Sequence, residues 1–176
     1  MKGFRFSALV LLLTALLCVC VHAKGERHIT DSGVWENIRW TLYDDGELYI
    51  SGNGAIPCVT YQWEVPWAEY KTSILSVTMA GNITELGFYG FYGCTNLKSV
   101  VIPNSVTRIL SDAFNGCASL ENVTIPEGTT TLGNRAFYGC TSLTSVTIPG
   151  KVNKIGERAF SGCTGLISVT ISEGVT

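Results

Sequence analysis

The chain has 176 residues and a formal net charge of −2; only 15% of its residues are charged, while 46% are hydrophobic. This composition excludes a disordered acidic tail, and it excludes a basic protein that binds nucleic acid. With two histidines in the whole chain, few side chains are available for general-base or metal chemistry at neutral pH. The length is that of one domain.

The first residues have the three parts of a secretory signal peptide. Lys2 and Arg5 make a positive start, residues 6–21 are free of charge, and Val21-His22-Ala23 ends the segment with small or apolar residues. A membrane anchor is the alternative, but this apolar run is shorter than the roughly 18 residues that a spanning helix needs. We therefore expect residues 1–23 to be cleaved, no membrane span to remain, and the mature protein to be secreted or on the cell surface.

Residues 34–72 do not repeat, and we expect residues 24–72 to form an N-terminal cap. Ile38, Trp40 and Leu42 alternate with polar residues before Asp44-Asp45-Gly46, and Leu48 and Ile50 follow. A two-residue loop would mix the two faces, whereas a three-residue loop pairs Leu42 with Leu48 and Trp40 with Ile50. Register follows the buried pattern. We therefore predict a bulged β-hairpin in which Gly46 is left-handed.

Residues 73–176 repeat with a period of 23 residues. Met79–Val101, Ile102–Thr124, Ile125–Thr147 and Ile148–Thr170 are four consecutive copies, named repeats 1 to 4 below. A partial copy precedes them, and the pattern restarts after Thr170 without its Leu, Ala-Phe and Cys. We expect four full repeats flanked by partial ones, in a chain that is a fragment of a longer protein. The alternative is a complete chain with an exposed last repeat.

Each copy contains a strand signal and a turn signal. The run L-x-x-V-x-I alternates with period two, as in a short strand with one buried face, and Pro103, Pro126 and Pro149 stop that strand. Ala-Phe follows later, with glycine two positions on, which is typical of a short helical or 3₁₀ turn closed by glycine.

Stacking follows from these signals, because one repeat cannot bury both its strand face and its Phe, while stacked repeats cover one another. We predict a leucine-rich-repeat solenoid with a short parallel β-sheet on one face and short helical or 3₁₀ turns opposite. Residues 23 apart then form columns, and the structural columns are Phe91, Phe114, Phe137, Phe160 and Cys94, Cys117, Cys140, Cys163.

The repeated phrase I-P-x-x-V-x-x-I-G-x-x-A-F-x-G-C-x-x-L-x-x-V-x resembles the BspA-like (Treponema-type) leucine-rich repeat over Ile74–Thr176. Departures are local: Leu110 replaces the usual Gly, Gly90 the usual Ala, and Ala80 the usual Pro. The hairpin WTLYDDGELYISGNGAI also resembles the amino-terminal hairpin that precedes the repeats in many BspA-like proteins. The resemblance implies adhesion to host or neighbouring-cell proteins, including extracellular-matrix components.

The cysteine column has two interpretations. Disulfides are common in exported chains, and neighbouring coils lie about 4.8 Å apart, which allows the bond. Stacked residues have parallel Cβ directions, however, and a row of sulfur atoms is no tetrahedron for zinc. We favour buried free thiols that act as small hydrophobic side chains. Cys58 lies off this column, with no evident partner.

Nothing in the sequence indicates catalysis. The mature chain keeps only His28, and no zinc, serine-hydrolase or phosphate-binding motif is present. We therefore predict no enzyme activity, no catalytic or metal-binding residues and no cofactor.

Two surfaces are candidates for binding. Polar residues between the buried strand columns form two stripes on the sheet face, which suits a protein partner; water-facing strand formers are the alternative. Aromatic residues crowd the cap, where Tyr43 and Tyr49 alternate with the buried set and could stack on a glycan, although a small aromatic core explains most of them. We predict a non-enzymatic adhesion protein, with a carbohydrate-binding module or a structural spacer of a larger surface protein as alternatives. The partner-binding candidates on the sheet face are Ser99, Val101, Asn122, Thr124, Ser145, Thr147, Ser168 and Thr170.

Overall fold

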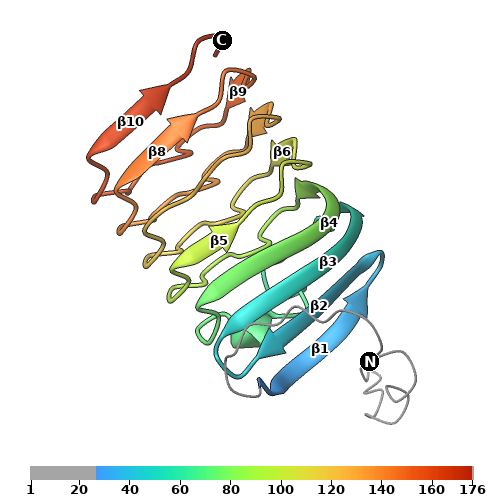
Figure 1. The fold of residues 1–176 in the computed structure, drawn as a ribbon. Helices are drawn as coiled ribbons and strands as arrows, with labels where there is room; N and C mark the ends of the chain where they lie inside the picture. The colour runs from blue at the N-terminus through green and yellow to red at the C-terminus, as the bar shows by residue number, and fades with distance from the viewer. Residues whose placement is uncertain (1–26, 176) are drawn as a thin grey trace.

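A computed structural model describes residues 27–175, so the predicted signal peptide lies outside the described residues. The chain forms a stack of coils that starts from a cap of antiparallel strands (Figure 1). In the cap, β1 pairs with β2 and β2 pairs with β3, and β3 then pairs in parallel with β4, the first strand of the repeats. The bounds of these strands are Ile29–Trp35, Ile38–Tyr43, Glu47–Ala55 and Ser76–Leu86.

The repeats pair through two parallel ladders. One contains the start of β4, then β5 (Ser99–Val101), a single bridging residue at Asn122, β8 (Ser145–Ile148) and β10 (Ser168–Ile171). The second ladder was not predicted, and it joins the end of β4 to three short strands. Paired residues of neighbouring repeats lie 23 positions apart, as in Arg108 opposite Thr131. The strands of the second ladder are β6 (Arg108–Ile109), β7 (Thr131–Leu132) and β9 (Lys154–Ile155).

The prediction of helical or 3₁₀ turns opposite the sheet holds for single turns, each closed by an N–H that donates three residues back, as Cys117 does to Phe114, but no helical segment forms in the repeats within residues 73–175. Within residues 27–175 the single helical segment is η1 (Ala68–Tyr70) of the cap. In these turns alternate N–H groups point to the next coil: Phe91, Phe114 and Phe137 donate at 2.8 Å to the carbonyls of the alanines that lie 22 residues further on. The Ala N–H groups donate within their own coil. A backbone N–H that donates to the next coil cannot also make the bonds within a helix, so the turn side is a third hydrogen-bonded ladder.

The cap hairpin has the register expected from its buried pattern. Leu42 lies opposite Leu48 and Trp40 opposite Ile50, and all four side chains are buried. Gly46, in the loop, has a φ of +82°, a left-handed conformation that glycine adopts without steric cost. The cap has one strand more than predicted, because β1 adds to the edge of β2.

Phenylalanine rings form the centre of the stack. Phe91, Phe114, Phe137 and Phe160 lie in file, with ring centroids 5.1, 5.2 and 5.3 Å apart and planes within 14° of parallel. Trp67 continues this file into the cap, since its ring stacks on Phe91 at 5.9 Å. Its indole N–H donates to the Gly90 carbonyl at 2.7 Å, so its one polar group is satisfied inside the core.

Trp67 also joins the cap strands to the repeats. Trp35 of β1 and Trp40 of β2 meet its ring edge to face, at 5.8 and 6.2 Å. A hydrogen bond from the Tyr70 hydroxyl to Asp31 Oδ2, at 2.8 Å, ties η1 to β1, and it raises the pKa of Tyr70 to about 12. The cap is therefore packed onto the first repeat through both aromatic and polar contacts.

Candidate functional site

The predicted sheet-face stripes lie in register on adjacent strands. In one stripe Ser76 pairs with Ser99, Ser99 with Asn122, Asn122 with Ser145 and Ser145 with Ser168. In the other, Thr78 pairs with Val101 in the first repeats and Thr147 with Thr170 in the last ones. Buried Val and Ile residues alternate with these positions in repeats 1 to 3, whereas Val169 and Ile171 of β10 are exposed. The exposed predicted residues, which we call the sheet face, are Ser99, Val101, Asn122, Thr124, Ser145, Thr147, Ser168 and Thr170.

The sheet face extends into the cap, where the sequence suggested a separate glycan site. Tyr49 pairs with Thr41 on one side and with Thr78 on the other, and it alternates with buried Leu48 and Ile50. Its ring is half-buried and belongs to the same outward row as Thr78 and Val101. Tyr49 is thus the aromatic end of the sheet face.

Tyr43 lies on the same outward face as that row, two positions from Thr41 in β2. Its ring is half-buried, and the Arg27 guanidinium lies 3.9 Å from the ring centroid. Arg27 is held there by ion pairs to Asp45 at 2.9 Å and Glu47 at 2.6 Å. A cation on the ring occupies a face that a sugar would need. One face of the Tyr43 ring is therefore covered by Arg27.

The sheet face has a shallow hollow at its middle. Its volume is about 390 Å³, and it lies between the strand segments of repeats 2 and 3. Asn122 makes single bridges there instead of a full strand, so this part of the ladder is the least regular. Four of the predicted partner-binding residues line the hollow, together with Glu127: Asn122, Thr124, Ser145 and Thr147.

The cysteine column consists of free thiols. Cys94, Cys117 and Cys140 are buried, and the thiols of Cys117 and Cys140 donate to the carbonyls of Phe91 and Phe114 at 3.2 and 3.4 Å. Burial raises the pKa of Cys94 to about 12 and that of Cys117 well above its usual value. These thiols stay protonated at neutral pH, which suits a structural column rather than a reactive one.

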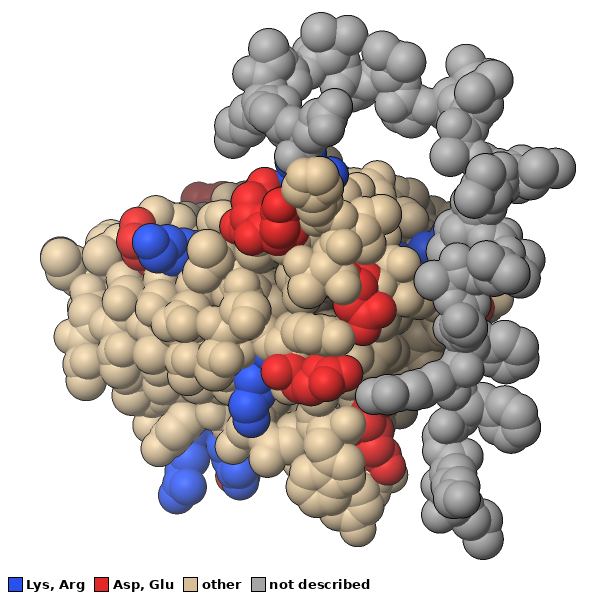
Figure 2. Space-filling view, turned by 90° about the horizontal axis from the view of Figure 1, so that it is seen from below, with Lys and Arg blue, Asp and Glu red and all other residues tan. Residues whose placement is uncertain are grey.

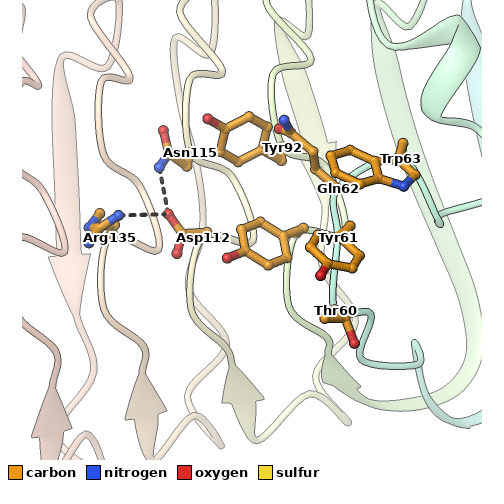
Figure 3. A pocket seen from close by; sticks show the side chains of 9 residues that line it. Thr60, Tyr61, Gln62, Trp63, Tyr92, Asp112, Asn115 and Arg135 are labelled. Atoms are coloured by element: carbon orange, nitrogen blue, oxygen red, sulfur yellow. Dashed lines mark hydrogen bonds and ion pairs between the residues drawn. The ribbon is translucent and has the colours of Figure 1, made fainter.

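A second hollow, of about 250 Å³, lies on the turn side next to the cap (Figure 3). Tyr61 and Trp63 form one wall; their rings stack at 4.7 Å with planes 4° apart, and they are 52% and 65% exposed. Tyr89 and Tyr92 of repeat 1 meet edge to face at 5.7 Å and form the floor. This grouping was missed from the sequence, which indicated only that aromatic residues crowd the cap.

The far side of this turn-side hollow is polar. Asp112 Oδ1 accepts a hydrogen bond from Asn115 Nδ2 at 2.6 Å and lies 4.0 Å from Arg135 Nη1. Tyr89, Asp112 and Arg135 occupy one column, and each has a left-handed φ between 53° and 60°. Arg158, in the next repeat, has the same conformation at φ 57°, so this backbone geometry comes from the coil itself.

Charged groups are sparse on the surface. In the face shown in Figure 2, acidic and basic side chains lie in small separate groups and most of the surface carries neither. In the described part of the chain, no group of three or more His, Cys, Asp or Glu side chains is placed to hold a metal ion. No helix within residues 27–175 is long and apolar enough to cross a membrane.

Comparison with known families matches residues 68–176 to the BspA type leucine rich repeat region, in six copies. The chain belongs to the BspA-type leucine-rich repeat family. The resemblance inferred from the repeated phrase is therefore confirmed, and so is the leucine-rich-repeat fold built mostly of strands. The match begins at residue 68, next to Trp67, which already packs on the first repeat's Phe91.

Solved structures of bacterial leucine-rich repeat proteins have the same fold. One from Eubacterium ventriosum is 24% identical, with a TM-score of 0.63 over 85% of this chain and 45% of its own length. The T. pallidum leucine rich repeat protein is 26% identical, with a TM-score of 0.58 over 79% of this chain and 71% of its own. One from Bacteroides ovatus is also 26% identical, with a TM-score of 0.58 over 78% of this chain and 40% of its own.

The chain thus spans less than half the length of two of these three relatives. A comparison with curated proteins gives no match. Membership of this family points to protein–protein interaction as the general role of the repeats.

Proposed function

We propose that this BspA-type protein is a secreted or cell-surface adhesion protein that binds an extracellular protein through the sheet face, without catalysis. The observation that supports it is the continuity of that face. Outward residues are paired in register from Glu47 of the cap through Ser76, Ser99, Asn122 and Ser145 to Ser168 of repeat 4. Beside this row, Tyr49 of the cap pairs with Thr78, and Thr78 with Val101. Repeat proteins use such extended, regular surfaces to bind partners.

The chemistry of the sheet face also suits a protein ligand. Hydroxyl and amide side chains offer both donors and acceptors, and they carry no charge that would have to lose its hydration on binding. Val101 adds an apolar group that is 59% exposed, and Tyr49 adds an aromatic one. The shallow hollow of repeats 2 and 3 gives one place where a partner side chain can rest against two neighbouring strands, beside the Glu127 carboxylate.

Secretion is part of the same proposal and has its own support. The signal-peptide pattern of residues 1–23 predicts export, and a surface protein needs no charged track for nucleic acid or anionic lipid. Mass spectrometry of the secreted chain is expected to find Lys24 as its first residue. Retention of the whole chain inside cells would contradict export.

The binding proposal is tested by placing a large charge on the sheet face. Thr147→Arg places an arginine at an exposed residue that lines the hollow. Asn153→Arg is the control, because it places an arginine at an exposed residue beside the second ladder. The parent and the two variants are passed over a panel of immobilised extracellular-matrix proteins in surface plasmon resonance. Any binding of the parent is expected to fall at least tenfold in Thr147→Arg and by less than twofold in Asn153→Arg. Equal binding by all three proteins would exclude the sheet face as the contact.

A further inference from the structure

We propose that the turn-side hollow binds a neutral oligosaccharide, with a pyranose ring on the exposed aromatic wall and its hydroxyl groups on the polar far side. This inference goes beyond the proposed protein-binding role, because the hollow lies on a different side of the coil from the sheet face. It also moves the glycan contact away from Tyr43 and Tyr49. The residues that carry the argument are Tyr61, Trp63, Tyr92, Asp112, Asn115 and Arg135.

The aromatic wall is open, which is unusual for residues of this size. Trp40 and Trp67 are 6% and 0% exposed, whereas Trp63 is 65% exposed and, within residues 27–175, stacks on Tyr61 alone. The two ring planes lie within 4° of parallel, so the pair presents a flat outer surface. The axial C–H groups of a pyranose form a flat apolar patch that fits such a ring, while its hydroxyl groups point outward at the rim.

The opposite side supplies hydrogen-bonding groups in fixed positions. Asn115 donates to Asp112 Oδ1, which leaves Asp112 Oδ2 without a donor among residues 27–175 and available to a ligand hydroxyl. Asn115 Oδ1 can accept, and the other N–H groups of Arg135 can donate. Figure 3 shows the Tyr92 ring lying between Asn115 and the Trp63 wall, so the aromatic and polar parts face one common space. Planar carboxylate, amide and guanidinium groups match pairs of adjacent hydroxyls.

Charge and size narrow the class of ligand. Asp112 and Arg135 are the two charged residues that line the hollow, and they lie 4.0 Å apart, so their charges offset each other. An anionic or cationic ligand would find no net charge to bind. The volume of about 250 Å³ is below the roughly 300–1,000 Å³ of pockets that enclose drug-sized ligands. The hollow therefore fits one ring of a longer chain that continues into solvent.

A protein side chain is the competing occupant, and the lining argues against it. Anchoring residues of protein partners enter well-packed pockets that exclude water. Here every residue that is not aromatic is polar, and no aliphatic side chain lines the hollow. Gln62 adds one more amide, whose Oε1 has no hydrogen-bond partner among the described residues.

The turn-side column offers matched variants. Trp63→Ala removes the wall, and Arg135→Ala removes one polar group; both residues are exposed, so the Phe file beneath them stays intact. Arg158→Ala is the control for Arg135→Ala, because it changes the same residue type in the same left-handed conformation one repeat further on. Tyr138→Ala is the control for an exposed aromatic residue, as Tyr138 is 39% exposed and shares the column of Tyr92.

The mature protein is applied to an array of neutral oligosaccharides of glucose, galactose, mannose and N-acetylhexosamines, and the strongest hit is titrated by calorimetry. We expect affinity to fall at least tenfold in Trp63→Ala and Arg135→Ala and less than twofold in the two controls, with Trp63→Tyr recovering part of it. Binding to no neutral glycan, binding only to acidic glycans, or equal affinity in all variants would overturn the proposal. Thr147→Arg is expected to bind the glycan normally, so failure of the sheet-face proposal and of this one can be told apart.

Discussion

The file of phenylalanine rings allows a sharp test of how the repeats stabilise one another. Phe137 is fully buried, and its ring stacks on Phe114 at 5.2 Å and on Phe160 at 5.3 Å. Phe137→Ala removes the burial of this side chain and leaves a cavity, and the two effects together lower the free energy of unfolding by about 3–5 kcal/mol. Loss of two stacked pairs, at roughly 0.5–1.5 kcal/mol each beyond burial, puts the expected cost at the upper end of that range.

Phe160 provides the matched control. It has the same residue type and the same place in the repeat, but it is only partly buried, and Phe137 is its one ring neighbour in the described residues. We expect Phe160→Ala to lower the free energy of unfolding by about half as much as Phe137→Ala, because it removes less buried apolar area and one stacked pair of rings instead of two.

Hydrogen exchange read by mass spectrometry locates the effect. The Phe114 and Phe137 N–H groups donate to the next coil at 2.8 Å, so loosening one turn removes bonds from its neighbours. We expect faster exchange in Phe137→Ala over at least two repeats, and a lower urea midpoint by circular dichroism. Exchange confined to Ile125–Thr147, or an equal cost for Phe160→Ala, would refute the idea that adjacent repeats are stabilised mainly through this file.

Two further predictions concern stability. In Gly90→Ala the new Cβ would meet only the Gly87 carbonyl oxygen, at 3.5 Å, so the usual family residue fits without a clash. The substitution should stabilise the protein by about 0.4–1 kcal/mol, because alanine lowers the conformational entropy of the unfolded chain. A lower urea midpoint would count against this. The pKa of the Cys94 thiol is raised from 9.0 to about 12 by burial, so above pH 9 only the unfolded state releases this proton. Through this group the free energy of unfolding falls by about 1.4 kcal/mol per pH unit between pH 9 and 12. In urea unfolding, the free energy of unfolding of Cys94→Ala should therefore fall less steeply with pH than that of the parent. Equal slopes in the two proteins would contradict a buried, protonated Cys94 thiol.

Much of this architecture could be predicted because the same pattern of residues recurs in four consecutive repeats. The 23-residue spacing places Phe114 above Phe137, and the alternation in L-x-x-V-x-I separates inward Val from outward Ser and Thr. The hairpin register was also accessible, since only the pairing of Leu42 with Leu48 keeps the apolar residues on one face. In each case a local pattern and a burial requirement lead to the same structure.

The features that could not be predicted depend on contacts between segments. The Ala-Phe turns look helical in isolation, but alternate N–H groups, such as those of Phe114 and Gly116, donate to the next coil, which no single repeat reveals. β1 contains Asp31 and Gly33, which are poor strand formers, and it is a strand because β2 offers it a free edge. The turn-side hollow forms where Tyr61 and Trp63 of the cap meet positions that differ between repeats, so the repeat pattern contains no sign of it.

One departure from the repeat pattern explains how the cap and the stack become one structure. Where Pro103, Pro126 and Pro149 stop the strand in later repeats, the first repeat has Ala80, which leaves φ free and keeps its N–H. β4 therefore continues for 11 residues through Ala80 to Leu86, and it contributes to both ladders. That length lets β3 pair with β4 from Glu47 to Ala55, so the cap is held by a long parallel ladder as well as by Trp67. The residue that departs from the family pattern is thus the one that lets a non-repeating cap join a repeating stack.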